Sequence, residues 1–148
     1  MIATPDFHII SVGTLKNRHF AALVDDYICR LRHDARITIF EIRDSNRHQE
    51  GHDIITRIDK TDGIVFALSE EGSAYTSRAF ATLLQQIPRR IIFVIGGPDG
   101  LNDEVKKRAD RLLSLSSYTF THEMARLLLA EQLYRACSIM RNRPYHRD

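Results

Sequence analysis

A buried strand that runs directly into glycines is the first segment with a chemical use. Residues 91–95 read Ile-Ile-Phe-Val-Ile, and Gly-Gly-Pro-Asp-Gly occupies residues 96–100. The glycines allow a ligand to approach the backbone closely, and Pro98 stiffens the turn. The segment is neither a phosphate-binding P-loop nor the Gly-x-Gly-x-x-Gly of dinucleotide sites. Both a ligand site and a simple tight turn fit this pattern.

A second candidate is the polar and aromatic loop over residues 115–122, which precedes a long apolar segment. Its hydroxyl and backbone groups can meet a polar ligand, and Tyr118 or Phe120 can flank an adenine ring. The loop can equally serve the protein itself, with Thr121 capping the next helix and Phe120 packed in the core.

The C-terminal tail, Arg141–Asp148, is the third candidate. Arginine contacts phosphate, Tyr145 can stack on an unpaired base, and His146 can exchange a proton near neutral pH. The net charge of the chain is only +2, yet its last 14 residues hold four arginines and one aspartate. This tail is either a phosphate-binding patch or a solvated chain end.

Two further segments are interpreted as surface rather than as sites. His48 and His52 have the helical spacing of metal ligands, but Gly51 weakens the helix and no third ligand is apparent. Glu70 and Glu71 follow a strand and are interpreted as a charged loop. The sequence therefore predicts no metal.

The elements that must position these segments alternate between strand and helix. Short apolar runs predict strands over residues 7–12, 37–42, 63–68, 90–95 and 112–115. Helical patterns separate them over residues 18–33, 49–59, 76–86 and 103–110, and a last one follows over residues 122–140. This alternation predicts a single α/β domain over residues 1–148, a parallel sheet flanked by helices with ligands near the carboxyl ends of the strands.

The last helix differs from the others because it is apolar around most of its circumference. Such a helix must be covered on more than one side, and the sheet can cover only one. We therefore expect a homodimer that packs through this helix.

The composition also bears on location. No apolar run approaches the roughly 20 residues of a membrane helix, and residues 1–7 lack the pattern of a secretory signal. Cys29 and Cys137 are far apart within apolar-periodic segments, so we expect two buried thiols. These features predict a cytoplasmic protein that does not bind a membrane.

Taken in order, the chemical segments resemble the RlmH family of ribosomal RNA large-subunit methyltransferases. The matching motifs are Gly96–Gly100, Leu115–His122, Arg126–Ala136 and Pro144–Arg147. The resemblance implies a SPOUT-type α/β fold whose C-terminal part, about residues 90–148, forms a trefoil knot. It also implies S-adenosyl-L-methionine as cofactor, a homodimer, and methylation of N3 of a pseudouridine in large-subunit ribosomal RNA.

The resemblance also assigns candidate site residues. Those for cofactor binding are Leu68, Gly97, Leu115, Ser116, Ser117, Tyr118, Thr119 and Phe120. His146 is the candidate for handling the N3 proton, with Arg126 and Tyr145 as further catalytic candidates. The candidates for RNA contacts are Arg135, Arg141, Arg143 and Arg147.

The chain departs from the family pattern after Leu68, where Ser69–Ser73 replaces the usual Asp-x-x-Gly-Lys. A proline expected before His122 is Thr121. Two alternatives stay open. One is a SPOUT methyltransferase acting on another RNA, against which the lack of an appended RNA-binding domain counts. The other is a noncatalytic ribosome-binding dimer, which the changed Ser69–Ser73 segment motivates.

Overall fold

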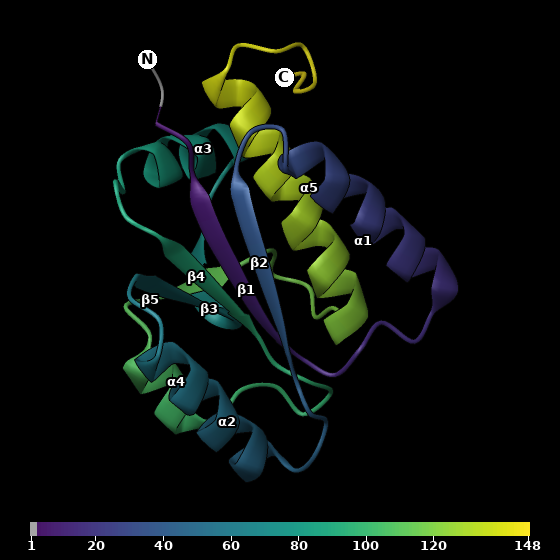
Figure 1. Ribbon diagram of the computed structural model, residues 1–148, viewed down its shortest axis with the longest axis vertical. Coiled ribbons are helices and arrows are strands. Elements are labelled where there is room, and N and C mark those ends of the chain that lie inside the picture. The colour runs from purple at the N-terminus through teal and green to yellow at the C-terminus, as the bar shows by residue number, and fades with distance from the viewer. Residues whose placement is uncertain (1–2) are drawn as a thin grey trace.

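The computed structural model describes residues 3–148, and strands alternate with helices along the chain (Figure 1). The strands are β1 (Asp6–Val12), β2 (Arg36–Ile42), β3 (Ile64–Ala74), β4 (Ile91–Ile95) and β5 (Arg111–Ser114). The helices are α1 (Arg18–Leu31), α2 (Arg47–Asp59), α3 (Ser77–Gln85), α4 (Asp103–Arg108) and α5 (His122–Met140). The predicted alternation is confirmed.

All five strands form one parallel sheet in the order β2-β1-β4-β3-β5. The first strand, β1, is internal and pairs with β2 on one side and with β4 on the other. Every element of the described chain belongs to this sheet or covers it, so residues 3–148 form one α/β domain. The predicted C-terminal knot stays a prediction.

Buried side chains alternate along the central strands because successive residues point to opposite faces of a sheet. Phe7, Ile9 and Phe93 belong to the core under α1, α3 and α5. Ile10 and Val94 belong to the core under α2 and α4. The sheet is therefore covered on both faces, as the apolar strands predict.

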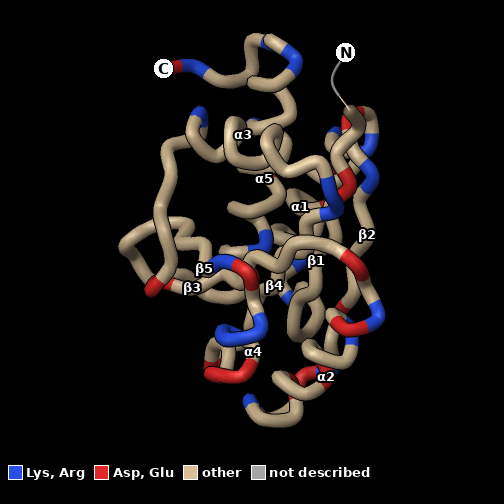
Figure 2. Tube along the Cα trace, turned by 90° about the vertical axis from the view of Figure 1, so that its left-hand side faces the viewer, with Lys and Arg blue, Asp and Glu red and all other residues tan. Residues whose placement is uncertain are grey.

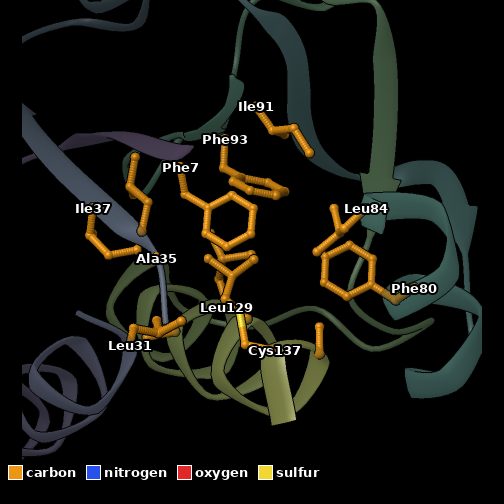
Figure 3. Packing of buried hydrophobic residues seen from close by; sticks show 14 of the residues in the cluster. Phe7, Leu31, Ala35, Ile37, Phe80, Leu84, Ile91, Phe93, Leu129 and Cys137 are labelled. Carbon is orange, nitrogen blue, oxygen red and sulfur yellow. The ribbon is translucent and has the colours of Figure 1, made fainter. Parts of the chain in front are cut away.

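Aromatic rings fill the core on the face of α1, α3 and α5. Phe7 and Phe80 approach Phe93 with ring centroids 5.9 Å and 6.4 Å away. Figure 3 shows the Phe7 ring pointing toward Leu129 of α5, with Cys137 next to Leu129. Burial raises the pKa of the Cys137 thiol to about 12, which leaves it an inert thiol of the core.

Each helix begins at a residue whose side chain accepts a hydrogen bond from the first turn. These N-cap residues are Asn17, Asn46, Thr76, Asn102 and Thr121. Their β-region backbone and short polar side chains are typical of helix starts. The cap considered for Thr121 is confirmed.

Two local expectations differ from the structure. The strand expected to end at Leu68 continues to Ala74, with a register shift against β5 between Leu68 and Ser73. Gly72 allows this second pairing because a Cβ there would lie 2.6 Å from the backbone nitrogen of Leu113. The expectation that both cysteines are buried is wrong for Cys29, which lies on the exposed face of α1.

Much of the apolar surface of α5 is covered within one chain. The helix lies on the sheet between α1 and α3, and Leu127, Tyr134 and Ile139 pack at the edge of the core. Met124 and Leu128 are half-buried and belong to neither core. The homodimer stays a prediction, with these two side chains as its strongest support.

Within residues 3–148, no helix combines the length and the apolar character that crossing a membrane requires.

Candidate cofactor cavity and C-terminal cluster

A cavity of about 960 Å³ opens at the carboxyl ends of β3, β4 and β5. Ligands of parallel α/β sheets bind at this edge, and the volume lies in the range of small-molecule sites. Seven of the eight predicted cofactor residues line it: Leu68, Gly97, Leu115, Ser116, Tyr118, Thr119 and Phe120. The eighth, Ser117, is exposed outside the lining.

The glycine turn forms one wall of the cavity. The amide of Gly100 donates to the carbonyl of Gly97 at 2.9 Å, which closes a turn with Pro98 and Asp99 at its centre. Gly100 has a φ of +75°, a left-handed conformation that glycine adopts without strain. A Cβ on Gly96 would lie 2.7 Å from the carbonyl carbon of Gly100, so the turn folds back on itself without room for a side chain at Gly96.

Gly97 presents its backbone, and not the position of a side chain, to the cavity. A Cβ there would point away, toward Val12 Cγ1 at 3.0 Å and Glu50 Oε2 at 3.4 Å. A larger residue at this position would push against the β1 and α2 side of the turn. The wall of the cavity therefore depends on close packing beneath it.

The loop over residues 115–121 forms the opposite wall and is braced by its own hydrogen bonds. Ser114 Oγ donates to the Ser116 carbonyl at 2.8 Å, and Ser116 Oγ accepts from the Tyr118 amide at 3.1 Å. Thr121 caps α5 by accepting from the Met124 amide at 3.2 Å. The Tyr118 side chain, in contrast, is 78% exposed at the rim, where a bound ring can meet it.

Several residues at the cavity carry no prediction from the sequence. Asn17 and Phe20 reach it from the start of α1, and the Asn17 amide donates to Glu123 Oε1 at 3.0 Å. Lys106 lines it from α4 and pairs with Glu71 Oε1 at 3.0 Å. They come from segments distant in sequence, so only a predicted strand order could have brought them to this edge.

Arg126 is close in sequence to residues that line the cavity, but its own side chain does not line it. Its guanidinium is buried and pairs with Glu41 Oε2 at 2.8 Å, with a longer bond to the Gly13 carbonyl at 3.4 Å. The pair connects α5 to the ends of β1 and β2. Its neighbour Ala125 lines the cavity.

The tail folds back on the far end of α5, where Tyr145 enters a cluster of polar and aromatic groups. Its hydroxyl lies 3.0 Å from the Tyr27 hydroxyl and donates to Glu131 Oε1 at 3.0 Å. Its ring meets Tyr134 edge-on at 4.7 Å, and the Arg135 guanidinium lies over it at 4.8 Å. Burial, followed by its hydrogen bonds, raises the pKa of Tyr145 well above its usual value.

His146 uses both of its ring nitrogens in this cluster. Arg135 Nη1 lies 3.1 Å from Nδ1, and because arginine has only donors, Nδ1 accepts. A neutral ring then carries its proton on Nε2, which donates to Asp148 Oδ1 at 3.1 Å. Asp148 in turn binds Arg78 through two bonds of 2.7 and 2.8 Å.

Three of the predicted RNA-contacting arginines are engaged within the chain. Arg141 Nε lies 3.3 Å from Oδ1 of the buried Asp34, and Arg143 pairs with the same oxygen. Arg135 holds the Glu131 carboxylate with two bonds, the shorter 2.6 Å. Arg147 is exposed.

The two halves of the predicted site lie at opposite ends of α5 within one chain. The cavity borders the start of α5, whereas the tail runs past its last turn and folds back onto its second half, on the far side of the molecule from α2 and α4 (Figures 1 and 2). A helix of 19 residues is roughly 28 Å long at 1.5 Å per residue. The catalytic roles of His146 and Tyr145 stay predictions, since their own chain does not bring them to the cavity.

A model of the family described as predicted SPOUT methyltransferase matches residues 6–146, which include every strand and helix of the fold. The chain belongs to the SPOUT methyltransferase family. Within the family, a relative from Prochlorococcus marinus named "Ribosomal RNA large subunit methyltransferase H" is 44% identical, and the match covers 100% of both chains. A relative of the same name from Nitratidesulfovibrio vulgaris is 41% identical over 93% of this chain and 96% of its own. The resemblance to the RlmH family is thereby confirmed.

A solved structure, described as that of a probable methylase family protein from Haemophilus influenzae, has the same fold. The match has a TM-score of 0.64 and 14% identity, and covers 96% of this chain and 70% of that one.

The departure of this family member after Leu68 falls at the cavity itself. Ser69, Glu70 and Glu71 line it, and they lie in the irregular part of β3 that the bulge produces. The ion pair between Glu71 and Lys106 places a lysine from another element near this segment.

The two histidines of α2, His48 and His52, are exposed as expected. Within the described chain, no group of three or more potential metal ligands occurs.

Proposed function

We propose that the protein is a methyltransferase that uses S-adenosyl-L-methionine to methylate N3 of a pseudouridine in large-subunit ribosomal RNA. The observation that carries this proposal is the meeting of seven predicted cofactor positions around one cavity, in a chain 44% identical to a named ribosomal RNA methyltransferase. The cofactor, the target atom and the dimer are parts of the proposal.

The residues at the cavity fit such a cofactor. The volume of about 960 Å³ accommodates a nucleoside with an amino-acid arm. The backbone of Gly97 and the polar loop around Ser116 and Thr119 offer donors and acceptors, and the exposed ring of Tyr118 can cover a base. A bound sulfonium cofactor supplies an activated methyl group and needs no metal.

The work of the protein in such a reaction is mainly positioning, because methyl transfer is an in-line displacement. The Gly97 turn and the loop over residues 115–120 would hold the donor from both sides. The acceptor N3 must lose a proton to become a good nucleophile, so a base, or a cation that stabilises the imide anion, belongs near the methyl group.

We place the tail of one chain at the cavity of a second chain. His146 and Tyr145 pack against the second half of α5 and do not line their own cavity, and both ring nitrogens of His146 are engaged there. A homodimer through α5, with Met124 and Leu128 on its surface, would bring a partner's tail within reach. His146 can accept the N3 proton at Nδ1 once its bond with Arg135 opens.

We further propose that residues 90–148 form the knotted part and that the enzyme works in the cytoplasm on the assembled ribosome. The small chain has no added RNA-binding domain within the described residues, so the shape of its target would supply much of the specificity. Arg147 and the other arginines of the tail would supply phosphate contacts.

The first test is calorimetric titration of the purified protein with S-adenosyl-L-methionine. We expect saturable binding, followed by transfer of labelled methyl groups to ribosomes that lack the modification, with the modified nucleotide located by mass spectrometry. A folded protein that binds the cofactor but methylates only another RNA would contradict the target. No binding by the folded protein, alone or with ribosomes, would favour the noncatalytic ribosome-binding dimer.

A further inference from the structure

Two consecutive residues at the start of α2 lie directly beneath the glycine turn and carry no assigned role. Glu50 is 4% exposed, and Gly51 is also buried. They lie on the side of α2 that faces β1 and α4, with which α2 shares one core. Figure 1 shows α2 and α4 next to each other on this side of the sheet.

The Glu50 carboxyl fills the space between the β2–α2 loop and the turn. Its Oε1 accepts from the Ser45 amide at 3.2 Å. Its Oε2 lies 3.4 Å from the position that a Cβ on Gly97 would take, beside Val12 Cγ1 at 3.0 Å. Gly97 is therefore packed against Glu50 and Val12 on one side while its other side borders the cavity.

Gly51 leaves room for Asn102 at the other end of the turn. A Cβ at this position would overlap the side-chain amide of Asn102, with 2.7 Å to its Cγ. Asn102 needs this place because its Oδ1 accepts from the Val105 amide at 3.0 Å and so begins α4. Glu50 and Gly51 together fix both ends of the segment from Gly97 to Asn102.

A carboxyl is a costly group to bury here. Desolvation raises the pKa of Glu50, the hydrogen bond from the Ser45 amide lowers it, and the carboxylates of Asp44 and Asp99 raise it. Within residues 3–148, Glu50 has no ion-pair partner. An apolar side chain of the same size would avoid this cost, but it could not accept the Ser45 hydrogen bond while it packs against Gly97.

We propose that Glu50 is a positioning residue of the cofactor site, which holds the Gly97 backbone at the cavity wall through the packing and hydrogen bonding of its carboxyl. This inference rests on the proposed function for its cofactor, but its structural part does not. A glutamine reproduces the carboxyl in size and as a hydrogen-bond acceptor, so it tests whether packing and accepting, and not charge, are what the position requires.

The test compares Glu50→Ala, Glu50→Asp and Glu50→Gln with the wild type, and uses Asp53→Ala as a control on the same helix. Asp53 bonds Gln49 on the surface of α2 and does not line the cavity. Calorimetry gives the affinity for S-adenosyl-L-methionine. Methylation assays give KM for the cofactor and kcat, and amide hydrogen exchange gives the protection of the Gly100 amide that bonds Gly97.

We expect Glu50→Ala and Glu50→Asp to weaken cofactor affinity by about 10-fold or more, because small displacements of a binding group are costly. The loss should appear in KM for the cofactor and leave kcat nearly unchanged, with faster exchange at Gly100. Glu50→Gln and Asp53→Ala should stay within about 3-fold of the wild type.

Wild-type affinity and Gly100 protection in folded Glu50→Ala would overturn the proposal, and if that variant does not fold, Glu50→Asp decides in the same way. A folded Glu50→Gln as weak as Glu50→Ala would also overturn it, since charge would then be the active property. If the wild type itself binds no cofactor, the proposed function fails, while hydrogen exchange still tests whether Glu50 holds the turn.

Discussion

The first half of α5 borders the cavity, and its second half borders the C-terminal tail. The sequence predicts a functional role for both regions, but different interactions hold them in place. At its start, the cavity walls are backbone segments, closed by a turn and by hydrogen bonds within the loop. At its end, the tail is held by side chains, with Glu131, Arg135 and Asp34 each serving more than one partner. A wall made of backbone changes only when its packing changes, whereas a tail held by side chains can be released.

The largest expected effect comes from Gly97→Arg, which disturbs the backbone wall of the cavity and leaves the tail unchanged. The new side chain would have to start toward Val12 and Glu50, so it should displace the turn and weaken S-adenosyl-L-methionine binding by about 100-fold or more. Calorimetry measures this effect, with Asp53→Arg on the surface of α2, outside the cavity lining, as control. Unchanged affinity in folded Gly97→Arg would show that the cofactor site lies elsewhere.

Removal of Tyr145–Asp148 should separate the contribution of the tail to methylation from that of the cavity to cofactor binding. We expect methylation to fall by about 100-fold while cofactor affinity stays within about 3-fold, because the proposed role of the tail is at the acceptor N3 and the cavity walls come from other residues. Single-turnover assays on ribosomes and calorimetry together measure both. Methylation at the full rate would show that the tail has no catalytic role.

A mixed dimer sharpens the comparison by asking which chain's tail serves which cavity. A Gly97→Arg chain keeps its tail, and a chain without Tyr145–Asp148 keeps its cavity. If the tail acts on the partner, co-expressed chains purified with two tags should regain about a quarter to a half of wild-type activity per dimer. Mixed dimers as inactive as either parent would place the tail in its own chain's site.

Asp34→Ala tests the force that anchors the tail. Asp34 is 4% exposed and is the shared partner of Arg141 and Arg143. Since both arginines still reach water, we expect the free energy of unfolding to fall by about 1–3 kcal/mol. Urea denaturation measures it, with the exposed Asp25→Ala as control. A loss no greater than that of the control would mean that the pairs contribute little.

The smallest expected effect is on Asp148. Its hydrogen bonds with Arg78 lower the pKa of its carboxyl to about 2 from 3.8, so this contact is fully present above pH 3.8 and is lost as the pH falls toward 2. Arg78→Ala should return the pKa toward its usual value, and an NMR titration of the carboxyl measures it. Arg89→Ala, which removes a surface pair with Asp62, is the control.

Local patterns in the sequence predict most of the fold. The alternation of apolar runs and helices gives all ten elements, and Thr121 caps the last helix as expected. The end of β3 was less predictable, because Ser69–Ala74 is polar and its pairing depends on the approach of Gly72 to β5. Cys29 is exposed although its segment is periodic, because it lies beside the buried Ile28 and not on its face.

The site was predictable only where one segment makes it. Glycines identify the turn after β4 in the sequence, and hydroxyl side chains identify the loop after β5. Both segments line the cavity. Asn17, Phe20 and Lys106 join them only through the strand order. The position of the tail depends on Asp34 and Tyr27, which the sequence places more than 100 residues away.

The internal position of β1 has a consequence for synthesis of the chain. A growing chain that has completed β2 can pair it with β1, but the other edge of β1 has no partner until β4 (Ile91–Ile95) has been made. That edge belongs to an apolar strand, and an unpaired apolar edge is a template for pairing with other chains. During translation, about 80 residues are therefore added between the end of β1 and the start of β4, at roughly 5–20 residues per second. For several seconds, protection of this edge depends on the ribosome exit region and on chaperones rather than on the fold.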